Sequence, residues 1–124
     1  MKDTATLLNK LLELRNQMKL YHWQTESHGH HIASDKFLKK AQNIIDKIVE
    51  VYHGKYKIIE LNDKNIKLQN LKEKDIIKYL ITVRDFLVND YHNYVNKNSN
   101  TDLLNLRDEL IAEINITIYL FRQK

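Results

Sequence analysis

The chain of 124 residues is 43% hydrophobic and 29% charged, which fits one domain over residues 1–124 with a single core and excludes a disordered chain. It contains no Cys, so disulfides and thiolate sites are excluded, and any metal would need His, Asp or Glu ligands. With no Pro, two Gly and a formal net charge of only +4, the composition favours an all-α domain without a strongly charged tail.

The first predicted helix begins at Asp3 or Thr4, either of which could cap it, and ends near Thr25. Its apolar residues recur with the spacing of one buried stripe, which consists of Leu7, Leu11, Leu14, Met18 and Tyr21.

The second predicted helix follows a turn over residues 26–34, whose sequence ESHGHHIAS contains Gly29. Ser34 is its predicted cap, with His30 as an alternative start, and Gly54 lies near its end. Its buried stripe would consist of Phe37, Ala41, Ile44, Ile45, Ile48, Tyr52 and Tyr56. Residues 57–75 are polar and rich in Asn, and they predict a long connector with a short helix in its middle.

Two further helices are predicted in the rest of the chain. The third covers residues 74–95, and the fourth is capped by Thr101 and extends to about Phe121. Two short connections and one long one predict a four-helix bundle in which the connector between the second and third helices crosses from end to end. This is the connectivity of ferritin-like folds.

A stripe of residues that can bind metals runs along the second helix beside its core face. At about 100° per residue, Asp35, Asp46 and His53 share one line, with His31 and Glu50 on either side. They form two clusters, one around Asp35 and one around Asp46. These clusters are separated by roughly 16 Å of helix rise, whereas a metal needs its ligands at about 2 Å.

One copy of this helix cannot bring both clusters to one ion, but two antiparallel copies can. A two-fold axis near Lys40 and Ala41, where the small side chain would ease the crossing, would create two equal sites in a homodimer. His22, near the end of the first helix, can reach the His31 cluster across the turn. The neighbouring Trp23 is predicted to pack in the core or at an interface.

Three short motifs carry a resemblance to a known family: HW at residues 22–23, HIASD at residues 31–35 and DKIVE at residues 46–50. In them the chain resembles the Dps-type mini-ferritins of the ferritin-like superfamily, which carry His-Trp near the end of the first helix and His-x3-Asp and Asp-x3-Glu on the second. The resemblance implies a ferroxidase site shared between two subunits. Its metal-binding and catalytic residues would be His22, His31 and Asp35 from one subunit and Asp46 and Glu50 from its partner.

The resemblance also implies an activity. The protein would bind ferrous iron, oxidise it with hydrogen peroxide or dioxygen, and store ferric iron inside a hollow dodecamer, which protects against oxidative damage. Imidazole and carboxylate ligands suit iron, and zinc could substitute. The alternative is a structural or DNA-compacting Dps-like shell whose site is unused or holds zinc. Some family members hold DNA with a tail rich in Lys or Arg before the first helix, and because this sequence shows none there, DNA binding is not carried over.

The other histidines allow different interpretations. His28 and His30 are predicted to face solvent in the turn, or to hold zinc or copper together with His31. Because the turn is about three residues shorter than in the family, either could replace His31 as a ligand. Glu50 and His53 form Glu-x2-His, which is typical of di-iron sites inside a bundle, but the fourth helix offers no matching motif.

The sequence contains neither the continuous apolar region of a signal peptide nor an apolar run of membrane-spanning length. We therefore expect a cytoplasmic protein with no membrane partner, or, if the gene is viral, one in the host cytoplasm or the virion. Its lysines are spread along the chain, which is more typical of a solvated surface than of a nucleic-acid site. The charged residues of the connector, Glu73 among them, are predicted to form part of that surface.

Overall fold

The computed structural model describes residues 3–61 and 66–124, and within these ranges every regular element is helical. The elements, in chain order, are α1 (Thr4–Gln24), α2 (His28–Lys55), α3 (Glu73–Asn89), the short 3-10 helix η1 (Tyr91–Asn93) and α4 (Thr101–Phe121). The prediction of an all-α chain with four helices is confirmed.

Side-chain caps fix where the first two helices begin. The Asp3 carboxylate accepts from the Ala5 N–H at 3.0 Å, so one of the two predicted caps of α1 is confirmed. The predicted turn over residues 26–34 is wrong, because the Ser27 hydroxyl caps α2 by accepting from the His30 N–H at 3.2 Å. A Ser cap stabilises a helix by about 1 kcal/mol, which offsets the similar cost of Gly29 in its first turn.

The predictions for the later helix ends were less accurate. The third helix ends at Asn89 rather than at residue 95. The chain then turns so that Tyr91 is fully buried, and its hydroxyl donates to the Leu103 carbonyl at 2.9 Å. The cap of α4 is Asn100, one residue before the predicted Thr101. The Asn100 side chain does not cap the helix because it accepts from the Tyr56 hydroxyl and donates to a backbone carbonyl.

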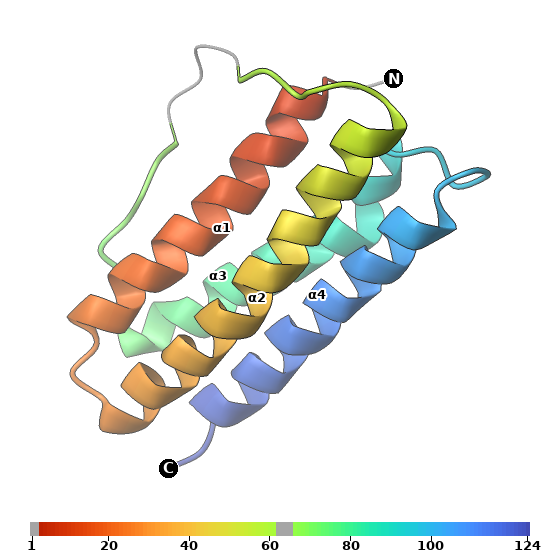
Figure 1. Ribbon diagram of the computed structural model, residues 1–124. Coiled ribbons are helices and arrows are strands. Elements are labelled where there is room, and N and C mark those ends of the chain that lie inside the picture. The colour runs from red at the N-terminus through yellow and green to blue at the C-terminus, as the bar shows by residue number, and fades with distance from the viewer. Residues whose placement is uncertain (1–2, 62–65) are drawn as a thin grey trace.

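The four helices form a bundle in which α2 packs against α1 and α4, and α3 packs against α4 (Figure 1). At one end, the Lys55 ammonium donates to the Ser99 carbonyl at 2.8 Å and to Asp102 at 2.9 Å, so α2 ends beside the start of α4. At the other end, Glu73 at the start of α3 accepts from Thr25 in the turn between α1 and α2. Residues 57–61 and 66–72 have no regular structure, and residues 62–65, on which part of the short helix predicted in the middle of this segment falls, lie outside the described residues.

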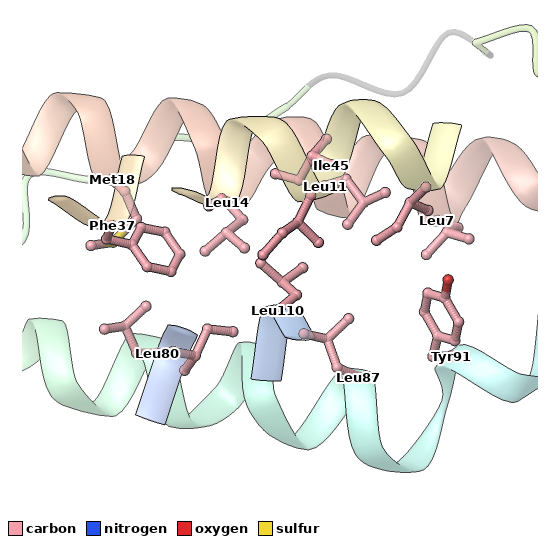
Figure 2. Packing of buried hydrophobic residues seen from close by; sticks show 14 of the residues in the cluster. Leu7, Leu11, Leu14, Met18, Phe37, Ile45, Leu80, Leu87, Tyr91 and Leu110 are labelled. Carbon is pink, nitrogen blue, oxygen red and sulfur yellow. The ribbon is translucent and has the colours of Figure 1, made fainter. Parts of the chain in front are cut away.

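The core is formed by the apolar stripes that the sequence predicts, with one exception: the prediction that Tyr56 is buried is wrong, because this residue follows the last turn of α2 and is 49% exposed. Figure 2 shows side chains of α1 and α2 pointing toward those of α3, with Leu110 of α4 between them. All five residues of the predicted α1 stripe are buried. Burial of these side chains is the main force that holds the helices together, because isolated helices of this length are only marginally stable in water. Within the described ranges, no helix is both long enough and apolar enough to cross a membrane.

We expect Leu80→Ala to lower the free energy of unfolding by about 2–5 kcal/mol, because Leu80 is fully buried where α3 meets the other helices. Urea unfolding followed by circular dichroism would measure the change. Val88→Ala is the matched control on the same helix, since Val88 is 49% exposed, and it should change stability by less than about 0.5 kcal/mol. Equal losses in the two variants would contradict this description of the core.

Candidate metal-binding site

The last turn of α1 and the first turn of α2 hold two histidine rings against each other. The ring centroids of His22 and His31 are 3.9 Å apart and their planes differ by 18°. The Nδ1 atom of His22 lies 2.8 Å from the His31 carbonyl oxygen, and the Nδ1 atom of His31 lies 2.9 Å from the His22 carbonyl oxygen. Each ring therefore bonds the backbone of the other residue.

These contacts fix the tautomer of both rings. A carbonyl oxygen can only accept, so both Nδ1 atoms must carry a hydrogen and donate it. Ser34 supports this arrangement, because its hydroxyl donates to the His31 carbonyl at 3.1 Å and lies 3.0 Å from Nδ1 of His22. Neither Nε2 atom forms a hydrogen bond to the described residues. A neutral imidazole whose Nδ1–H is held by a carbonyl presents its Nε2 lone pair to a metal.

Asp35 lies one turn beyond His31 at the edge of this pair. Its carboxylate is 3.1 Å from the Lys39 ammonium, and its side chain is 41% exposed. The hydrogen bond from Lys39 holds the pKa of Asp35 below its ordinary value, and the positive charge of Lys39 acts in the same direction. Beside Asp35 there is a hollow of about 440 Å³ between α1 and α2. It is lined by Arg15, Asn16, Lys19, Asp35, Leu38, Lys39 and Gln42.

Asp46 and Glu50 lie on the same uninterrupted helix but far from the histidine pair. Both side chains are exposed; Asp46 accepts from Gln42 at 2.7 Å, and Glu50 bonds to none of the described residues. The eleven positions from Asp35 to Asp46 span roughly 16 Å along α2. In residues 3–61 and 66–124 no three His, Asp or Glu side chains are grouped to hold an ion. One chain therefore pairs His22 with His31, has Asp35 at the edge of the pair, and leaves the second acidic cluster apart.

The prediction that His30 faces solvent is wrong. His30 is only 8% exposed and stacks on Phe121 of α4, with ring centroids 4.4 Å apart. Its Nε2 atom donates to the Phe121 carbonyl at 2.9 Å, so its Nδ1 atom accepts from the Tyr21 hydroxyl at 2.6 Å. Both nitrogens are occupied, which excludes His30 as a replacement for His31. Extending the α2 stripe back from Phe37 to His30, seven residues earlier, could have revealed this position.

Two other predictions are corrected by burial. Trp23 is 68% exposed, so it does not pack in the core of its own chain; the Lys19 ammonium lies 5.4 Å above its ring. Ala41 is only 2% exposed because it belongs to the core stripe, so it cannot lie at a crossing with a second α2. His28 is exposed as predicted, although it is the first residue of α2 rather than part of a turn.

The alternative site inside the bundle gains no support from the arrangement of its residues. The Nε2 atom of His53 accepts from the Ile59 N–H at 3.0 Å, so this imidazole holds the chain after α2. Glu113 on α4 lies 3.9 Å from the Lys40 ammonium. Both of these groups already have partners within the chain.

Glu73 is a residue of this region that sequence reasoning missed. Its carboxylate accepts from the Thr25 hydroxyl at 2.7 Å and from the Glu26 N–H at 3.1 Å, in the turn that separates the two histidines. The hydrogen bond from Thr25 is the largest cause that lowers the pKa of Glu73 from 4.5 to about 2. No local signal marks this residue, because the contact joins positions 48 residues apart.

We expect His30→Ala to destabilise the protein by about 2–4 kcal/mol, because the loss of the ring removes buried packing and leaves the Tyr21 hydroxyl and the Phe121 carbonyl without their partner. His28→Ala is the control, since that exposed side chain should contribute less than about 0.5 kcal/mol. Urea unfolding at pH 7 would compare the two variants. A His30→Ala protein as stable as the control would show that this buried pair is not formed.

The lowered pKa of Glu73 predicts a pH dependence of stability. A carboxyl group whose pKa falls from 4.5 to about 2 on folding stabilises the folded state above pH 4.5, and this contribution is lost as the pH falls toward 2. Wild type should therefore be more stable than Glu73→Gln at pH 7, with the difference shrinking between pH 4.5 and pH 3. Urea unfolding across this range would measure it. A difference that does not change with pH would contradict the assignment.

The family of this chain follows from comparison with known proteins. No curated protein and no solved structure matches it. A family of unknown function (DUF5856) matches residues 22–121, a segment that starts at His22 and includes the other four predicted ligands. Since this match covers most of the 124 residues, the chain belongs to this family of unknown function.

Proposed function

We propose that this protein binds ferrous iron at a site shared by two of its subunits and oxidises it. The supporting observation is the His22–His31 pair, in which each Nδ1–H is held by a backbone carbonyl and each Nε2 lone pair is left for a metal. Metal-binding histidines typically have this second hydrogen bond, which fixes the tautomer and the orientation of the ring. Stacked rings 3.9 Å apart would repel each other if both were charged, which favours neutral, metal-binding imidazoles.

In this proposal a second subunit completes the ligand set. Two imidazoles and one carboxylate from one chain are too few for a site that holds two ions, and among the described residues the exposed Asp46 and Glu50 belong to no group of three side chains that could hold an ion. A second α2 running antiparallel, with the two-fold axis near Lys39 and Gln42, brings its acidic cluster opposite Asp35. The axis lies on the outer face of α2, because Ala41 is turned into the core.

The proposed reaction consumes iron as its substrate. Two ferrous ions lose one electron each, and hydrogen peroxide accepts both electrons and two protons to give two molecules of water. His22 and His31 bind the ferrous ion as neutral donors. Asp35 with the partner's Asp46 and Glu50 adds negative charge, which stabilises the ferric product more than the ferrous ion and so favours oxidation. Lys39 must leave Asp35 before iron binds there, since the two are paired in the metal-free chain.

The assembly belongs to the same proposal. The segment from residue 56 to residue 72 crosses the bundle from end to end, as in ferritin-like folds. The supporting observations are that Lys55 lies beside the start of α4 and Glu73 beside the end of α1. Seventeen extended residues reach about 56 Å, well beyond the roughly 26 Å length of α3. From the resemblance to mini-ferritins, the proposal also includes a dodecameric cage that stores ferric iron.

A second candidate is a shell protein whose site holds zinc. The specific observation in its favour is the donor set of a single chain, which offers two imidazoles while its one nearby carboxylate, on Asp35, is bound to Lys39. Zinc accepts imidazole ligands in such a set without any redox step. A protein of this kind would assemble normally and bind Zn(II), and it would not accelerate the oxidation of Fe(II).

We expect Asp46→Ala/Glu50→Ala to abolish fast Fe(II) oxidation by peroxide, followed by absorbance, while helicity and stability stay unchanged because both side chains are exposed. Asp85→Ala/Glu109→Ala removes two exposed acids from α3 and α4 and is the matched control, which should oxidise iron at the wild-type rate. The proposal fails if wild type is no faster than buffer, or if the two double variants are equally active. Light scattering on the same samples would report the size of the assembly.

A further inference from the structure

The first residue of α3 is attached to the turn that joins α1 to α2. One carboxylate oxygen of Glu73 accepts both from the Thr25 hydroxyl at 2.7 Å and from the Glu26 N–H at 3.1 Å. This turn has three residues, Thr25 to Ser27, and it separates the helix end that carries His22 from the helix start that carries His31. A carboxylate that accepts two hydrogen bonds makes a stronger contact than a neutral acceptor would.

Hydrogen bonds extend this attachment to both helices. The Thr25 hydroxyl that donates to Glu73 also accepts from the Ser27 N–H at 3.2 Å, and the Ser27 hydroxyl accepts from the His30 N–H at 3.2 Å. On the other side, the Thr25 N–H donates to the Tyr21 carbonyl at 2.9 Å. A continuous series of contacts therefore runs from Glu73 to the residues that directly precede His22 and His31.

The segment before α3 is held by contacts that do not involve Glu73. The Gln17 side chain is 1% exposed, and its amide donates to the Gln69 carbonyl and accepts from the Gln69 N–H, both at 2.8 Å. Gln24 donates to the Asn70 side chain at 2.8 Å. The start of α3 should thus stay beside α1 when the Glu73 carboxylate is removed, so the effect of that carboxylate on the turn can be tested alone.

We infer that Glu73 is a positioning residue for the His22–His31 pair, which it holds in register by fixing the turn between α1 and α2. The two rings exchange hydrogen bonds with each other's backbone, so their contact depends on the distance between the two helix ends. A turn that relaxes would lengthen the bonds of 2.8 and 2.9 Å and release both Nδ1–H groups. The consequence for metal affinity rests on the proposed function, whereas the positioning itself can be measured in metal-free protein.

The test measures the tautomers of the two rings by NMR of metal-free protein labelled with ¹⁵N-histidine. Wild type should show His22 and His31 in the Nδ1–H form, with slowly exchanging protons. Glu73→Ala and Thr25→Val should move both rings toward a mixture of tautomers, and Thr25→Ser, which keeps the hydroxyl, should restore the wild-type spectrum. Asp75→Ala is the matched control, because it removes another carboxylate from the first turn of α3. The spectra are compared only among variants whose helicity, measured by circular dichroism, equals that of wild type.

A Co(II) titration of the same proteins separates this inference from the proposed function. Glu73→Ala should weaken Co(II) binding about tenfold, the lower end of the effect of residues that orient metal ligands. Unchanged His22 and His31 tautomers in both Glu73→Ala and Thr25→Val would overturn the inference, and so would an equal change in Asp75→Ala. Altered tautomers together with no Co(II) binding by wild type would support the positioning role and count against the metal site.

Discussion

Two histidine rings that each donate to the backbone carbonyl of the other hold the end of α1 against the start of α2. This contact depends on a turn of only three residues, and it determines which groups face outward. Because His30 comes two positions after the start of α2, its side chain points into the core, where it joins Tyr21 of α1 to the last turn of α4. Because His31 follows it, that ring lies on the outer edge. The position of this short turn thus places the side chain of His30 in the core and that of His31 on the outer edge.

The charges on the outer face of α1 and α2 favour a metal site shared by two subunits over a site built within one chain. Arg15, Lys19 and Lys39 line the hollow beside Asp35, and the ammonium of Lys39 is paired with that carboxylate. The exposed acids Asp46 and Glu50 lie too far along α2 to help within the chain. A second subunit would supply negative charge where the first has an excess of cations, so the proposed dimer also balances the charges of the two surfaces.

The sequence predicted those parts of the fold that depend on helical periodicity. The buried stripes of α1 and α2 follow from apolar residues three and four positions apart, and the structure confirms them except at Tyr56, where α2 has already ended. It did not predict the start of α2, because Gly29 is typical of a turn, whereas here it lies in the first turn of a helix that Ser27 caps. With the helix start misplaced, His30 was predicted to face solvent instead of the core.

The candidate site was predictable to a similar degree. Spacing alone placed His22 within reach of His31, and the rings are indeed in contact. The role of Glu73 could not be predicted, since a contact between distant positions leaves no periodic pattern in the sequence. The joint role of the two clusters of α2 stays a prediction, because it concerns two chains rather than one.

The most direct test of the shared site is complementation between two inactive variants, His22→Ala/His31→Ala and Asp46→Ala/Glu50→Ala. When they are mixed under conditions that exchange subunits, half of the dimers contain one chain of each kind, and each such dimer has one intact site and one site that keeps only Asp35. The account predicts that Fe(II) oxidation by peroxide, absent in either variant alone, returns to about a quarter of the wild-type rate. If wild type is active and the mixture stays inactive although mixed dimers form, each site lies within one chain, and the shared site is contradicted.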